Sequence, residues 1–299
     1  MKKYLRYADV LVLFTGALGL FLRLIITLGG TDAKGLYPKN HPAWIILCIL
    51  SAGVVAALWL LTRQVGADQR YKKNFPASRS GAICAALAAI GIAFTAFDLF
   101  ATDLLSIVCF LTGIASMAGL LFAGYCRFFG KKPHFICHAA PAAFFALRLF
   151  LLGKDLGAET EVSRYLFEML ASVAMIPACY QLWGFDVGMG KRENSLFWSL
   201  TAAYLCVVAI VGVENWLLYV TCAAWLLTNT CSLQYLPKKM RPVPVQSEQD
   251  IPETDPMEAA APAEVSQSVA AETPAQPLED IDPEAILAEI LREIDKTVE

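Results

Sequence analysis

Three charged residues stand inside long apolar stretches of the sequence: Arg23, Arg148 and Glu168. A charge placed in hydrocarbon costs about 2.5 to 3.5 kcal/mol on insertion scales, so each of these residues needs a partner, water or a functional role. Each lies four or five residues from one end of its apolar run, which corresponds to about 6 to 8 Å along a helix. We therefore expect all three at one depth, where they form a candidate intramembrane polar site.

Three interpretations of this site are open. Both arginines could snorkel to the lipid headgroups at the outer surface, which requires no partner. Arg148 and Glu168 could instead form an internal ion pair, because a short loop joins their two apolar runs and should make them neighbours. Arg23 would be a second cation beside that pair if two halves of the chain packed symmetrically. The third interpretation is a binding site for an anion or a substrate.

Two prolines, Pro141 and Pro177, lie in the same two apolar runs as Arg148 and Glu168. Proline removes a backbone hydrogen bond, so each residue predicts a helix kink. Two adjacent kinked helices can open a cavity, and His138, Tyr180 and Gln181 would then lie on its cytoplasmic side. The alternative is a kink that serves packing alone.

Motifs of soluble enzymes are missing from the sequence. The stretch 184–192 resembles a phosphate-binding loop only superficially, because its glycine spacing is wrong and Arg192 replaces the required Ser or Thr. HExxH and GxSxG do not occur, and no two intramembrane carboxylates form a dyad. An enzyme is therefore disfavoured, although an active site assembled from distant helices remains an alternative.

The 9 cysteines fall within apolar runs and form no CxxC pair. We expect them to be small buried thiols and not disulfides or zinc ligands. No metal and no cofactor are expected. The basic segment 63–79 is explained by membrane topology, so nucleic-acid binding is not expected either.

The elements that must position these residues are long apolar helices. Of the 299 residues, 57% are hydrophobic and 17% are charged, whereas a soluble domain carries about 25% charge. Runs long enough to cross a hydrocarbon core of about 30 Å predict an all-α, polytopic transmembrane bundle with eight spans. The predicted spans are 8–28, 42–62, 80–98, 102–126, 135–152, 164–183, 195–213 and 216–236.

The distribution of Lys and Arg predicts the orientation of these spans. With the N-terminus inside, the inner segments hold 16 Lys and Arg and the outer loops hold 4. Because positive charge resists translocation, both termini are predicted to be cytoplasmic, in a multi-pass protein of the plasma membrane. The lipid bilayer is thus the first predicted partner.

Small residues predict close packing of the third and fourth spans, which a short linker joins. The residues at four-residue spacing are Gly81, Ala85, Ala89 and Ala93 in one span and Ala115, Gly119 and Ala123 in the other. Short sequence matches between the two halves, such as Leu22-Arg23-Leu24 with Leu147-Arg148-Leu149, suggest a parallel repeat of four plus four spans. Chance matching of apolar segments is the alternative.

The chain divides by charge into a membrane domain, a tether and a terminal helix. Residues 1–240 hold 21 Lys and Arg against 12 Asp and Glu, while residues 241–299 hold 3 against 15. Residues 241–281 are acidic and contain many prolines but no aromatic residue, which predicts a disordered tether. Residues 282–299 predict an amphipathic helix that begins at Asp282 and Pro283.

The apolar face of the terminal helix is a candidate binding surface for a cytoplasmic protein. Its residues are Ile286, Leu287, Ile290, Leu291 and Ile294. The net acidity argues against docking on lipid. The alternatives are a solubilising end that binds nothing and a helix that docks on the protein's own basic inner loop.

These features predict a non-enzymatic membrane scaffold or sensor that recruits a cytoplasmic partner through its C-terminal helix. The alternative is a small secondary transporter or permease, with its polar site between the first, fifth and sixth spans.

Overall fold

A computed structural model describes residues 8–28, 42–63, 71–101, 103–156 and 162–234. These residues belong to a compact unit that ends at Val243, and the chain from Pro244 to Glu299 forms a second unit. The predicted tether and the terminal helix with Ile286, Leu287, Ile290, Leu291 and Ile294 lie outside the described residues.

The described residues are helical, and no strand occurs among them. A long helix stands at each of the eight predicted positions, and a short additional helix, α4 (Tyr71–Asn74), precedes α5. The long helices are α2 (Ala8–Leu28), α3 (Pro42–Thr62), α5 (Arg79–Asp98), α6 (Leu104–Phe128), α7 (Ile136–Leu156), α8 (Val162–Val187), α9 (Arg192–Ala209) and α10 (Trp216–Gln234).

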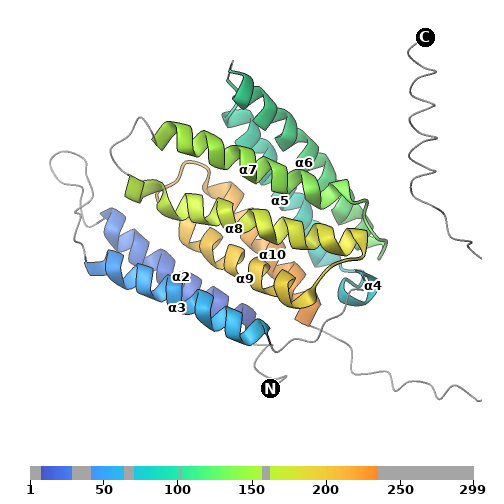
Figure 1. Ribbon diagram of the computed structural model, residues 1–299, viewed down its shortest axis with the longest axis horizontal. Helices are drawn as coiled ribbons and strands as arrows, with labels where there is room; N and C mark the ends of the chain where they lie inside the picture. Colours follow the sequence, from blue (N-terminus) through green and yellow to red (C-terminus); the bar gives the residue numbers. More distant parts are fainter. Residues whose placement is uncertain (1–7, 29–41, 64–70, 102, 157–161, 235–299) are drawn as a thin grey trace, which may run out of the picture. The chain divides into compact units, whose positions relative to one another are not determined.

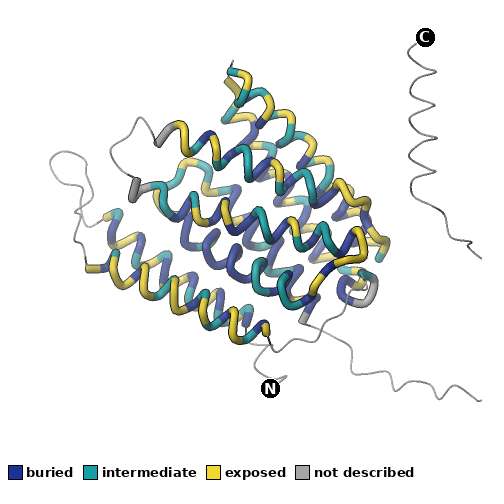
Figure 2. Tube along the Cα trace, viewed as in Figure 1, coloured by how far each residue is buried: buried dark blue, intermediate teal, exposed yellow. Residues whose placement is uncertain are grey.

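Seven of these helices are long and apolar enough to cross a membrane, and α9 is not among them. Helix α9 begins with Arg192, Glu193 and Asn194, and most of its remaining residues are buried, as Figure 2 shows along nearly its whole length. A helix that other helices surround does not need apolar side chains on every face, because it contacts protein and not lipid. The described part of the chain is thus a multi-pass helical bundle in which α9 is the central helix.

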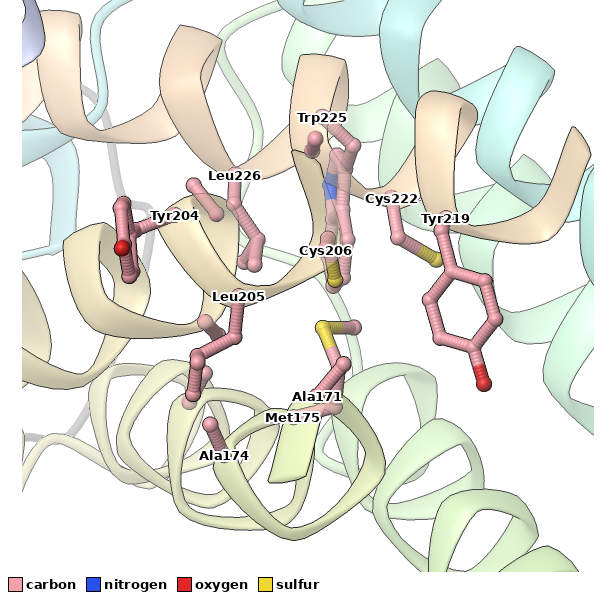
Figure 3. Close-up of a cluster of buried hydrophobic side chains, with 14 of the residues drawn as sticks. Ala171, Ala174, Met175, Tyr204, Leu205, Cys206, Tyr219, Cys222, Trp225 and Leu226 are labelled. Atoms are coloured by element: carbon pink, nitrogen blue, oxygen red, sulfur yellow. The ribbon is translucent and has the colours of Figure 1, made fainter. Parts of the chain in front are cut away.

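The long helices pack in a closed series. Helices α5, α6, α7, α8, α9 and α10 each contact the next, and α10 returns to contact α5. Helices α2 and α3 contact each other and pack on α9 (Figure 1). The inner faces of α8, α9 and α10 form a core that includes Met175, Cys206 and Trp225 (Figure 3).

The close packing predicted for α5 and α6 is present, but α6 uses other small residues. A Cβ on Gly113 would lie 2.4 Å from Ala96 Cβ, and a Cβ on Gly124 would lie 3.1 Å from the Ala82 carbonyl oxygen. Ala115 is exposed, and Gly119 faces the backbone of Cys137 in α7. The predicted stripe was therefore wrong for α6, because its four-residue spacing follows a different face of the helix.

All 9 cysteines are free thiols in the described residues, and Cys48 and Cys231 are exposed. The expectation that every cysteine is buried was wrong for these two, and Cys84 is only half-buried. Their apolar positions lie on outward faces of α3 and α10, where lipid can replace protein contacts.

The contacts of the two halves do not repeat. Helix α8 packs extensively against α9, whereas the pair at the equivalent position, α3 and α5, is not among the main contacts of the described residues. The four-plus-four duplication stays a prediction.

Candidate functional site

Arg148 and Glu168 form an ion pair, which was one of the three interpretations left open by the sequence. Arg148 of α7 donates from Nη2 to Glu168 Oε1 of α8 over 2.6 Å. Tyr219 of α10 donates its hydroxyl hydrogen to the same oxygen over 3.2 Å. Arg148 is 1% exposed and Glu168 5% exposed, so Arg148 does not snorkel to a lipid surface.

The guanidinium of Arg148 is only partly engaged by this pair. Its Cζ lies 5.4 Å from the centroid of the Tyr219 ring, a cation–π contact. Its Nε and Nη1 atoms are buried and have no hydrogen-bond partner among the described residues. One end of the bundle thus holds a triad of Arg148, Glu168 and Tyr219 from three helices, and Arg148 has two further donor atoms.

Arg23 of α2 binds a helix end. Its Nη1 donates to the carbonyl oxygen of Val208 over 3.1 Å, and its Cζ lies 5.5 Å from the Phe167 ring centroid. Val208 stands in the last turn of α9, where carbonyl groups have no partner within the helix and attract cations. Arg192 donates in the same way to the carbonyl oxygen of Leu233, near the end of α10.

A second buried pair, which was not predicted, joins the same two helices at their other ends. His138 Nδ1 of α7 lies 2.5 Å from Asp186 Oδ2 of α8. The imidazole stacks on Trp225 of α10, with ring centroids 6.1 Å apart and planes at 9°. Both members of the pair are buried.

Asp186 was missed because Gly184 was interpreted as the start of a loop, whereas α8 continues to Val187. The signal that could have found Asp186 is its spacing from Glu168. Eighteen residues make five turns of an α-helix, so both carboxylates share one face at a separation of about 27 Å. One ion pair and one His–Asp contact therefore fasten α7 to α8 at opposite ends of the two helices, and α10 contributes a ring to each.

A small cavity adjoins the His138 pair. The space open to the centre of a water molecule is about 20 Å³. This is room for one or two waters. Its lining comes from α4, α5, α6, α7, α8 and α10, and the residues are Tyr71, Phe75, Gly81, Ala85, Ala123, Arg127, His138, Leu182, Trp225 and Asn229.

Pro141 and Pro177 lie inside α7 and α8, and both helices continue through them. The kinks at these residues stay a prediction. His138 lines a cavity, but this cavity is shared by six helices and is not the predicted opening between α7 and α8. Tyr180 is 55% exposed and points outward, so its predicted place in the cavity was wrong.

The described residues contain no group of three or more His, Cys, Asp or Glu side chains that could hold a metal ion. Comparison of the chain with protein-family models, curated proteins and solved structures finds no match. The buried Arg148–Glu168 ion pair, the buried His138–Asp186 contact and the small cavity beside it are thus the features on which a functional argument rests.

Proposed function

We propose that this protein is an eight-span protein of the plasma membrane with both termini in the cytoplasm, and that its bundle anchors a C-terminal helix that recruits a cytoplasmic protein. In this proposal α9 also crosses the membrane, as the seventh of eight crossings. The bundle then places the start of the tail at the inner membrane surface.

One observation carries the proposal: the intramembrane charges have internal structural contacts. Arg23 binds the end of α9, and Arg148 binds Glu168 beside Tyr219. A bundle in which Arg23, Arg148 and Glu168 have internal partners suits an anchor, whereas the acidic segment 241–299 with the apolar face of its predicted helix suits partner binding.

Photo-crosslinking in cells tests recruitment directly. A photoreactive residue at Leu291, on the apolar face, is expected to yield one discrete adduct. The same residue at Glu289, on the polar face, serves as the matched control and is expected to yield none. Equal adducts at both positions, or none at Leu291, would contradict the proposal.

A small carrier is the second candidate function, and the free Nε and Nη1 atoms of Arg148 are the observation that favours it. Deletion of residues 242–299 separates the two candidates. A scaffold loses its adduct and its cellular effect on deletion, whereas a carrier retains flux. Arg148→Gln abolishes flux in a carrier and leaves recruitment intact in a scaffold.

A further inference from the structure

Arg127 is a buried cation at the inner end of the bundle. It stands in the last turn of α6 and is 4% exposed. Its Nη2 donates to Ser232 Oγ over 2.5 Å, and its Cζ lies 4.8 Å from the Phe75 ring centroid. Its Nε and Nη1 atoms are buried and have no hydrogen-bond partner among the described residues.

The charge of Arg127 is uncompensated by the ion pairs of the described bundle. The carboxylates in those pairs are Asp186, Glu168 and Asp103, and their partners are His138, Arg148 and Lys154. A guanidinium remains protonated in proteins, so it cannot avoid the cost of burial by losing its proton. Arg127 itself is not a member of these pairs, so its buried guanidinium can still accept a negative charge beside it.

The cavity provides space beside the unpartnered nitrogen atoms. Gly81 and Arg127 both line it, and a Cβ on Gly81 would lie 3.1 Å from Arg127 Nε. The absence of a side chain at position 81 therefore leaves this nitrogen open. The amide of Asn229 lines the same space.

Tyr71 of α4 adds a hydroxyl group to the cavity wall. Burial raises the pKa of the Tyr71 phenol, although the charge of Arg127 opposes this shift. The phenol therefore keeps its proton at neutral pH and is available as a hydrogen-bond donor. Donors from α4, α6 and α10 thus surround one small space.

We propose that this cavity binds a small monovalent inorganic anion of the size of chloride. Space for one or two waters admits a halide and excludes phosphate or an organic acid. The single charge of the Arg127 guanidinium suits a monovalent anion. The lining comes from six helices around the inside of the closed series, so the anion reaches the site from solution and not from a lipid headgroup.

Thermal unfolding of the full-length protein in detergent tests this site. Unfolding is compared between chloride or bromide and gluconate at constant ionic strength. Gluconate is the reference anion because it is too large for the cavity. The unfolding midpoint of the wild type is expected to rise with the logarithm of halide concentration, since a ligand that binds only the folded state stabilises it by mass action. Equal midpoints in chloride and gluconate would overturn the proposal.

Variants assign the effect to the cavity. Arg127→Gln is expected to weaken the apparent affinity for chloride by about 10- to 100-fold, the factor for a lost hydrogen bond to a charged group. Gly81→Ala keeps the arginine but fills the space beside Nε, and it decides the question if Arg127→Gln does not fold.

Two control variants are matched to these changes. Arg63→Gln removes an exposed arginine that lies over Trp59, and Gly53→Ala adds a methyl group where nothing lies within 4 Å. Both controls should keep the response to chloride. A response that persists in Gly81→Ala, or that disappears equally in the controls, would rule the site out.

Discussion

Arg148 and Glu168 illustrate how a membrane bundle manages a buried charge. Removal of either partner would leave the other charge without compensation in a low-dielectric interior, which is costlier than removal of both. Tyr219 stabilises Glu168 with a further hydrogen bond. The pair is therefore expected to behave as one unit in mutational analysis.

A double-mutant cycle checks this expectation. Arg148→Gln and Glu168→Gln are each expected to lower the free energy of unfolding by about 3 to 5 kcal/mol, the range for breaking a buried pair. The double variant should recover part of this loss, as measured by reversible denaturation in detergent. Lys154→Gln, which removes the partner of Asp103 in an exposed pair, is the control and should change stability little. Additive losses at Arg148 and Glu168 would show that the two residues are not coupled.

The sequence offered one buried pair among its interpretations but not the other. Arg148 and Glu168 stand out because both interrupt apolar runs on adjacent spans. Asp186 lies between Gly184 and the polar start of the next segment, so a helix end seemed to precede it. Continuation of α8 through Gly184 is set by packing, since Phe185 beside it is buried and contacts Phe75, the residue after α4.

At the scale of helices, small residues decide how closely α5 and α6 approach. Inside a membrane, apolar side chains gain no hydrophobic free energy when they exchange contacts with lipid for contacts with each other. Close backbone packing must therefore supply the free energy of helix association. Gly113 meets Ala96 of α5 and Phe144 of α7. This glycine therefore sits where three helices converge.

Gly113→Ala is expected to destabilise the bundle by about 1 to 3 kcal/mol, the usual cost of overpacking. The added Cβ would lie 2.4 Å from Ala96 Cβ, and neither atom is on a flexible chain end. Unfolding in detergent measures the effect. The control is Gly53→Ala on α3, which should be neutral or stabilising because its new methyl group meets no neighbour. A neutral Gly113→Ala variant would show that α5 and α6 separate without cost.

Helix positions were predictable because length and hydropathy act locally, but helix faces were not. The bounds of α2 and α3 agree with the predicted spans. For α6 the four-residue spacing of Ala115 and Gly119 pointed to the wrong face, since its inward face depends on α5 and α7 together. The central position of α9 likewise follows from its contacts with α2, α3, α8 and α10. The sequence of one span does not indicate such contacts.

At the scale of the whole molecule, the charge bias that predicts the topology has two origins. Arg127 and Arg192 count toward the predicted inner surface, yet both are buried and bind groups near the end of α10. The exposed basic residues of the inner loops, such as Lys131 and Lys191, orient the chain without such contacts. The proposed anion cavity and the predicted orientation signal thus share the same end of the bundle, which is why the cationic residues alone did not reveal the cavity.

The eight-span topology depends on α9, the helix least suited to lipid, and labelling on its two sides tests it. Met189 lies before α9 and Glu214 after it, and both residues are exposed. If α9 crosses with the N-terminus inside, Glu214→Cys reacts with a membrane-impermeant maleimide in intact cells. Met189→Cys then reacts only after permeabilisation, with wild-type protein as the control for native thiols. Reaction of both variants from one side would mean that α9 does not cross, and the tail would then lie on the opposite side of the membrane from the proposed partner.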